Sequence, residues 1–325
     1  MKSQRFKKQL NNKTESESCL LCCHKLSINI ENVFDTRFGI HTAFGIAKCL
    51  SCDLEYTVPL ITPKKLKKLY KKYYNFGGEK STAYTRLREK FLSSSIYCLW
   101  LVIDGDISFH CKKGQGRLLD VGCNEGRGLK IYQRNGYIAE GLEPNETAAK
   151  EARKAGFRIY ADSLEKFEPE KLYDVIVLSN VIEHSLDPKV MLYHVGRLLK
   201  PGGQIWISCP NMNSWQRKFF GRYWINWHVP FHIVHFSQIS LLNILIETDF
   251  EIQEIRQESP ALWVTHSVIV RLFAKSGRPT KQLRNPFWVA FLLILTRILF
   301  FPFLWLENRM GRGDCIIAIA IKKNK

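Results

Sequence analysis

The stretch LLDVGCNEGRG, residues 118–128, places a short apolar run and an aspartate directly before a glycine-rich turn. A continuous apolar run of this length is typical of a strand that is covered on both faces. Gly122, Gly126 and Gly128 have no side chains, so a ligand can approach the backbone of this turn closely. Dinucleotide-binding folds use G-x-G-x-x-G at such a turn. Asn124 occupies the second glycine position here, which indicates a ligand without a pyrophosphate.

Strand-like and helix-like segments alternate after this turn. Two helices are expected at residues 145–156 and 187–203, the second ending in a Pro-Gly-Gly stop. Further strands are expected at residues 137–144, 157–160, 173–181 and 204–210. Repeated strand–helix units of this kind predict an α/β fold with a doubly wound, mostly parallel sheet. Ligands then bind at the carboxyl ends of the strands.

Acidic residues stand where such a ligand would need them. Glu143 lies 21 residues after Gly122, at the end of the second strand, where a carboxylate can accept hydrogen bonds from both ribose hydroxyls. Asp162 follows the third strand and is placed to receive an adenine amino group. The ligand predicted from these positions is a nucleoside that lacks a diphosphate.

Five segments, in this order and spacing, resemble the class I S-adenosylmethionine-dependent methyltransferases. They are LLDVGCNEG, GLEPNE, ADSLE, YDVIVLSNVIEHSLDP and LLKPGGQIWISCPN. The resemblance covers residues 117–257 and resumes near 313–322. It implies a Rossmann-like, seven-stranded sheet whose last strand, within 314–323, runs antiparallel beside 250–257.

The resemblance also implies a donor-binding site for S-adenosylmethionine. The methionine side would be formed by Asp120, Gly122, Cys123 and Gly126, the ribose would be held by Glu143, the adenine would lie against Asp162 and Ser163, and the floor near the methyl group would be lined by Asn180 and Val181. Asn124 replaces a glycine that is frequent in the family, and asparagine tolerates the positive φ that such a turn requires.

A hydroxyl acceptor would benefit from a general base, and histidine suits neutral pH. The candidates are His232, then His228 and then His184. The first two lie in WHVPFHIVHFS, similar to a segment that related methyltransferases of sugars and quinone precursors carry over the active site. Trp215, Trp224 and Trp227 crowd the same region, either as a face for the acceptor or as core.

Two cysteine pairs near the amino terminus, Cys19-x-x-Cys22 and Cys49-x-x-Cys52, have the spacing of zinc knuckles. Together they predict a structural Zn²⁺ site in a zinc-ribbon-like module, with unligated cysteines as the alternative. Cys23 and His24 fit the spacing less well. No apolar signal segment is evident, so a reducing cytoplasmic setting is expected.

The charge of +18 is concentrated at the two ends of the chain. Residues 1–118 hold 21 Lys and Arg against 10 Asp and Glu, residues 119–250 hold 15 against 15, and residues 251–325 hold 12 against 5. Basic ends favour contact with something anionic. Four parts are predicted: a disordered tail (1–17), the ribbon module (18–62), a helical linker or cap (63–104), and the methyltransferase domain (105–325) with a hydrophobic helical insertion at about 260–310.

Residues 287–306, FWVAFLLILTRILFFPFLWL, are long and apolar enough to cross a bilayer. Arg297 and Pro302 argue against a span, and the last strand must return to the same sheet. A membrane-dipping insertion flanked by arginines and lysines is therefore preferred to a soluble helical cap or a true span, and it would pack against residues 262–273.

The predicted function is methyl transfer from S-adenosylmethionine to a small-molecule or lipid-linked acceptor. O-methylation of a sugar in a cell-surface glycan is the leading form, with a cytoplasmic enzyme peripheral on the cytoplasmic face of the membrane. A quinone or aromatic-lipid acceptor is a variant. An RNA methyltransferase is less favoured, because the Asn/Asp-Pro-Pro-aromatic motif of many base aminomethylases is absent after residue 179. A binding module without turnover is the third class. The sequence indicates no oligomeric state.

Overall fold

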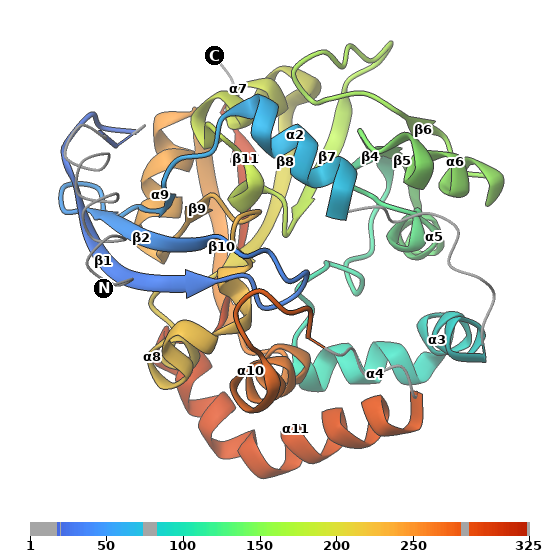
Figure 1. The fold of residues 1–325 in the computed structure, drawn as a ribbon. Helices are drawn as coiled ribbons and strands as arrows, with labels where there is room; N and C mark the ends of the chain where they lie inside the picture. The colour runs from blue at the N-terminus through green and yellow to red at the C-terminus, as the bar shows by residue number, and fades with distance from the viewer. Residues whose placement is uncertain (1–17, 20, 74–82, 281–285, 324–325) are drawn as a thin grey trace.

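The chain forms two sheets in a computed structural model that describes residues 18–19, 21–73, 83–280 and 286–323 (Figure 1). The larger sheet has seven strands in the order β10-β11-β8-β7-β4-β5-β6. Their bounds are β4 Gly116–Val121, β5 Tyr137–Leu142, β6 Ile159–Tyr160, β7 Tyr173–Ser179, β8 Leu199–Pro210, β10 Phe250–Glu258 and β11 Cys315–Lys322.

Strands β4 to β8 run parallel, and β11 is antiparallel to both of its neighbours, β8 and β10. The predicted α/β fold with an antiparallel last strand is therefore confirmed. The register pairs Cys315 of β11 with Pro210 and with Glu258. The end of β10 and the start of β11 thus lie at the same edge as the carboxyl ends of the parallel strands.

Helices cover both faces of this sheet (Figure 1). Their bounds are α5 Arg127–Arg134, α6 Glu146–Lys154, α7 Pro188–Leu198 and α9 Gln238–Glu247. Apolar side chains alternate between two buried clusters along the central strands, with Leu118 and Val177 in one cluster and Leu119 and Ile176 in the other. This alternation is what a sheet buried on both faces requires.

The smaller sheet has the order β1-β2-β3-β9. Strands β1 Leu26–Phe34, β2 Ala43–Cys49 and β3 Glu55–Val58 come from the amino-terminal module, whereas β9 Val234–His235 comes from the histidine-rich segment of the large domain. Glu55 pairs with His235 and Tyr56 with Val234. The module therefore shares a sheet, and one continuous hydrophobic cluster, with the large domain.

Three helices connect the module to β4. They are α2 Pro63–Tyr73, α3 Ala83–Leu92 and α4 Ser95–Asp104. In α2, Leu66 is buried while the lysines are exposed, so this helix is basic and amphipathic. The predicted disordered tail, residues 1–17, lies outside the described residues.

The apolar segment near the carboxyl terminus forms α11, Pro286–Arg309, which packs against α10, Ala261–Phe273 (Figure 1). The predicted return of the chain against residues 262–273 is thus confirmed. Over Phe287–Arg309 the helix is long and apolar enough to cross a membrane, and only 11% of its most apolar window is buried. Its inward face carries polar groups: Thr296 bonds Thr265, and Arg297 lies 3.7 Å from the carboxylate of Asp104 on α4.

Candidate active site

The glycine-rich turn after β4 has the conformation that its sequence predicts. Gly122, Asn124 and Gly126 all have positive φ, at 72°, 49° and 76°. Asparagine is among the few non-glycine residues that adopt this region readily. The replacement of a family glycine by Asn124 therefore leaves the turn intact.

Glu143, at the end of β5, holds this turn in place. Its Oε2 accepts a hydrogen bond from the backbone nitrogen of Asn124 at 3.0 Å, and its Oε1 accepts one from that of Asn145 at 2.8 Å. Burial raises the pKa of Glu143, and the two backbone N–H groups oppose that rise. The carboxylate predicted to bind a ribose thus lies directly beside the bare turn.

The turn also meets the end of β7. A Cβ placed on Gly122 would lie 3.2 Å from Cγ2 of Val181, so residues 122 and 181 adjoin across the sheet edge. Cys123 is buried against Gly141 of β5, where a Cβ would clash with its Sγ. Asn180 has φ of 54° and donates its backbone N–H to the carbonyl oxygen of Ser208.

Asp120 is a buried acidic group at the end of β4. Burial, and then the charge of nearby Glu143, raise its pKa to about 7. Asp162 and Ser163 follow β6; Asp162 is exposed and accepts a hydrogen bond from the backbone nitrogen of Ser163. Because the backbone nitrogen of Glu143 donates to Tyr160 at the end of β6, these two residues lie on the neighbouring strand end.

All three histidines predicted as base candidates come together. The ring centroids of His184 and His232 are 4.7 Å apart, and that of His228 lies 4.9 Å from His232. Burial lowers the pKa of His184 to about 4 and holds those of His228 and His232 well below their usual range. The imidazoles are therefore neutral at pH 7.

Glu183 is the residue of this region that the sequence analysis did not select. It lies in the short helix η1, Ile182–His184, directly after β7, and is only 1% exposed. Both carboxylate oxygens lack a hydrogen-bond partner among the described residues, and Oε1 lies 3.9 Å from Nε2 of His232. Burial raises its pKa to about 8. The sequence signal that could have identified Glu183 is an acidic residue next to a candidate histidine, His184, directly after a strand.

The three tryptophans do not share one role. Trp224 and Trp227 are fully buried, so they form core and not a face for the acceptor. Trp215 is partly buried and packs against Phe303 of α11. Nε1 of Trp224 donates to the buried carboxylate of Asp314 at 2.8 Å.

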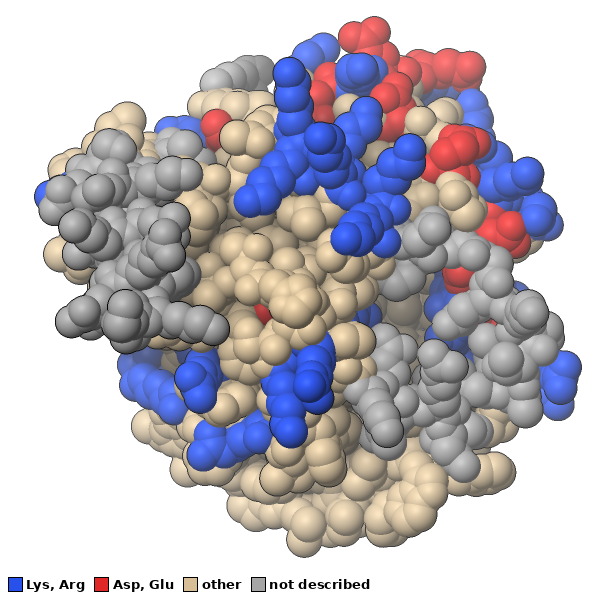
Figure 2. All heavy atoms as spheres, in the orientation of Figure 1, with Lys and Arg blue, Asp and Glu red and all other residues tan. Residues whose placement is uncertain are grey.

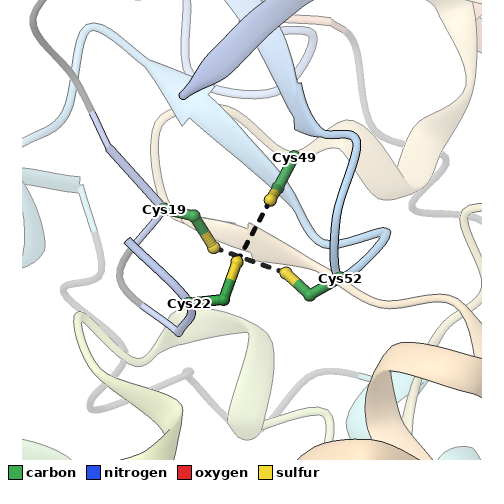
Figure 3. A group of neighbouring side chains, drawn as sticks. All are labelled: Cys19, Cys22, Cys49 and Cys52. Carbon is green, nitrogen blue, oxygen red and sulfur yellow. Dashed lines mark hydrogen bonds between the residues drawn. The ribbon is translucent and has the colours of Figure 1, made fainter. Parts of the chain in front are cut away.

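The four cysteines of the amino-terminal module converge on one point (Figure 3). Their sulfur atoms lie within 4.8 Å of one another, with Cys19–Cys52 and Cys22–Cys49 at 3.4 Å. An ion at about 2.3 Å from four thiolates needs sulfurs about 3.8 Å apart, so the set fits tetrahedral zinc. Cys23 and His24 lie outside this group, and both are exposed.

Comparison with known proteins gives the family of the large domain. A family model described as "Methyltransferase domain" matches residues 89–255, more than half of the chain. Ubiquinone biosynthesis O-methyltransferases from two strains of Klebsiella pneumoniae are each 30% identical over 124 residues, which cover 35% of this chain and 51% of the relative. The chain thus spans about half the length of the curated relatives it matches.

Among solved structures, the chain is similar to the Burkholderia thailandensis 1,6-didemethyltoxoflavin-N1-methyltransferase, with a TM-score of 0.47 and 14% identity over 88% of this chain and 98% of that one. From the extent of the family match, together with the strand order and the glycine turn, it follows that this chain belongs to the methyltransferase-domain family.

Proposed function

We propose that the chain transfers a methyl group from S-adenosylmethionine to a hydroxyl group of a small-molecule or lipid-linked acceptor. The observation that carries this proposal is the juxtaposition of the bare turn, the carboxylate of Glu143 and the histidines at one sheet edge. The family match supports the donor. Asp120, Cys123 and Gly126 would enclose its methionine part, and Asp162 and Ser163 would flank its adenine.

The chemistry asks little of the protein beyond alignment, because the sulfonium methyl group is already activated. The site must place the acceptor oxygen in line with the S–CH₃ bond and exclude water. Asn180 and Val181, between the turn and η1, would form the floor at the methyl group. The oxygen–carbon bond forms as the sulfur–carbon bond breaks, and the acceptor's proton must leave.

We propose that one of the histidines, with Glu183 beside it, accepts that proton. Neutral imidazoles retain a lone pair, and His232 remains the first candidate for the base, before His228 and His184. Replacing His232 with alanine should spare donor affinity and slow turnover.

The acceptor we propose is a sugar of a lipid-linked glycan. Aromatic rings beside the histidines would suit its apolar face: Phe38 of the module stacks on His228, with centroids 6.0 Å apart, and Tyr70 of α2 bonds Nδ1 of His184 at 3.0 Å. A quinone-type ring is the second candidate, which the name of the Klebsiella relatives favours. RNA is the least favoured acceptor.

A lipid-linked acceptor requires contact with a membrane, and four helices offer a surface for it. We define the apolar face as the exposed apolar side chains of α4, α8 (Trp215–Phe220), α10 and α11. These are Ile96, Leu99, Val102, Ile103, Phe219, Leu262, Leu272, Phe273, Phe287, Trp288, Phe291, Ile294, Ile298, Leu299, Phe300, Phe301, Phe303, Trp305, Leu306 and Met310. Soluble monomers rarely expose so large an apolar surface.

The amphipathicity of α11 is inverted relative to a helix of a water-soluble protein. Thr296, Arg297 and Glu307 are buried, whereas Ile298 and Leu299 are about two-thirds exposed. Arg297 thus points into the protein and anchors α11 to α4 through Asp104. An interfacial helix has this arrangement, with its apolar side turned outward to the acyl chains.

Basic residues border the apolar face. Figure 2 shows its lower part free of charged side chains, with lysines and arginines above it. Exposed basic residues on or next to the four helices are Lys218, Arg222, Arg271, Lys275, Arg278 and Arg309. Such a border suits anionic headgroups. Because α8 and α10 follow the ends of β8 and β10, the apolar face lies on the carboxyl-edge side of the sheet, where the site is.

Vesicle flotation tests the membrane contact. We expect the full chain to float with vesicles of phosphatidylcholine and phosphatidylglycerol, less with phosphatidylcholine alone, and to dissociate in part at high salt. The variant Ile298→Glu/Leu299→Glu should stay at the bottom of the gradient, while Ile239→Glu, on an exposed position of α9, should float like the parent protein. Equal flotation of the two variants would contradict the apolar face as the contact.

Labelled S-adenosylmethionine tests the acceptor class. Incubation with glycolipid, quinone-precursor and RNA fractions should transfer label to the glycolipid fraction. Label in the quinone fraction alone would establish the second candidate, and label in RNA alone would overturn the proposal. Absence of donor binding in calorimetry would favour a module without turnover.

Donor affinity should rise with pH up to about 7. The positive sulfonium and ammonium groups favour ionised Asp120, whose pKa in the free protein is about 7. Below that pH, binding must release a proton, so the affinity should increase up to tenfold per pH unit and then level off. Calorimetry from pH 5.5 to 7.5 in two buffers of different ionisation enthalpy measures the release. The variant Asp120→Asn should give a flat profile; a flat profile in the parent protein would exclude this role.

We also propose that the four-cysteine site binds Zn²⁺ and that this ion has a structural role. It would be held by Cys19, Cys22, Cys49 and Cys52, with no open position for chemistry. Its effect on the active site would be indirect. Strand β3 of the module pairs with β9, and Thr57 donates from its hydroxyl to the carbonyl oxygen of His232 at 2.6 Å.

A further inference from the structure

We infer that Glu183, His184 and His232 form a second metal site, for a divalent transition ion of the zinc type, at the acceptor side of the active site. One ligand atom from each residue lies within 4.8 Å of the other two. These three residues are called the Glu–His–His cluster below. The role of the ion in activating the acceptor hydroxyl rests on the proposed methyl transfer, whereas the metal site itself does not.

His232 is already oriented as a metal ligand would be. Nδ1 of His184 lies 3.0 Å from both the carbonyl oxygen of Phe231 and the hydroxyl of Tyr70, which can donate or accept, so these contacts do not fix which ring nitrogen of His184 carries the proton. Nδ1 of His232 lies 2.7 Å from the carbonyl oxygen of Asn226. Because a carbonyl oxygen can only accept, Nδ1 of His232 carries the proton and its Nε2 is left with a lone pair. Metal-bound histidines are held in this way by a backbone carbonyl on the other nitrogen.

Glu183 supplies the anionic ligand. A fully buried carboxylate with no hydrogen-bond partner for either oxygen among the described residues is costly, and native proteins rarely leave such a group unpaired. A cation held between this carboxylate, Nε2 of His232 and a ring nitrogen of His184 would satisfy it. Among the described residues, no lysine or arginine lies within ion-pair distance of Glu183, and the contact found there is the 3.9 Å approach of Nε2 of neutral His232.

The spacing fits an ion after a small contraction. Ligand atoms at about 2.0–2.2 Å from an ion lie about 3–3.5 Å apart, so the three side chains would close by about 1 Å. Two histidines and one carboxylate leave coordination positions open, as in catalytic sites and unlike the closed four-cysteine site. His184 is partly exposed, so the cluster borders the protein surface.

An ion here would act on the acceptor hydroxyl. Bound to the ion, the hydroxyl loses its proton to water more readily, and the resulting oxygen anion attacks the methyl carbon as the sulfur–carbon bond breaks. S-adenosylhomocysteine leaves as a neutral thioether. In this arrangement His232 serves as a ligand, and the ion takes over the activation otherwise assigned to the histidine base.

Metal content of the purified full chain tests the site. After dialysis against Zn²⁺, we expect two ions per chain, and one in Glu183→Gln and in His184→Gln. The matched control is His235→Gln, which alters a buried histidine of the same segment that bonds Thr57 and stands outside the cluster. It should retain two ions. An equal ion count in the parent protein and Glu183→Gln would overturn the inference.

Cobalt substitution assigns the ions even if a variant folds poorly. Co²⁺ in the cysteine site gives thiolate-to-metal charge-transfer absorption, whereas Co²⁺ bound by nitrogen and oxygen gives only ligand-field bands. The parent protein should take up a second equivalent without further charge-transfer absorption, and saturation after the thiolate signal would refute the second site. Calorimetry with S-adenosylmethionine on the same samples separates the two proposals. If the parent protein takes up the second ion but does not bind the donor, the proposed methyl transfer is refuted and the metal site stands.

Discussion

Replacing Glu143 with alanine should weaken binding of S-adenosylmethionine by about 100-fold. A hydrogen bond to a charged group contributes about 1.5–3 kcal/mol, and each 1.4 kcal/mol is a factor of ten in affinity. The substitution also removes the acceptor of the Asn124 backbone N–H, so the turn itself loosens. Isothermal titration calorimetry with the donor measures the change directly.

The control for this substitution lies three residues away. Glu146 is exposed at the start of α6 and pairs with Arg153 at 2.9 Å, so Glu146→Ala should leave donor affinity within about twofold. Glu143→Gln keeps the shape but loses the charge and should fall between the two. Donor affinity of Glu143→Ala equal to that of Glu146→Ala would show that the donor does not bind at this strand end.

Replacing Asp314 with alanine should reduce the free energy of unfolding by about 3–5 kcal/mol. The carboxylate is fully buried and accepts hydrogen bonds from Ser214 at 2.7 Å, Trp224 at 2.8 Å and Asn226 at 3.0 Å. Alanine would leave three buried donors unsatisfied. Urea unfolding followed by tryptophan fluorescence measures the loss.

An exposed aspartate provides the comparison. Asp187 caps α7, accepting from the backbone nitrogens of Lys189 and Val190, and Asp187→Ala should cost about 1 kcal/mol. If both variants lost the same amount, the buried network would contribute less than its geometry implies. Because Asn226 accepts from Nδ1 of His232, Asp314→Ala should also disturb the cluster and lower uptake of the second ion.

Local sequence determined the part of the sheet edge that we propose binds the donor. The apolar strand at 118–121, the positive-φ turn and the acid at the end of the next strand are all set by residues close in the chain, and parallel strands bring their carboxyl ends to one edge whatever the side chains elsewhere. The same pattern predicted the strands at 137–144, 157–160, 173–181 and 204–210, whereas the seven-stranded sheet with an antiparallel last strand was implied by the family resemblance. The helical linker or cap predicted at 63–104 likewise contains α2, α3 and α4.

The acceptor side depended on contacts between distant segments. Nothing local shows that β9 joins the sheet of the cysteine module, since a two-residue strand has no periodicity, and its pairing with β3 spans some 180 residues. In the sequence, Glu183 is one acidic residue after a strand. Only the tertiary packing buries its carboxylate beside His232. The apolar face was foreseen only in residues 287–306. Its continuation onto α4, α8 and α10 comes from tertiary contacts: Arg297 of α11 pairs with Asp104 of α4, and α10 packs against both α11 and α8.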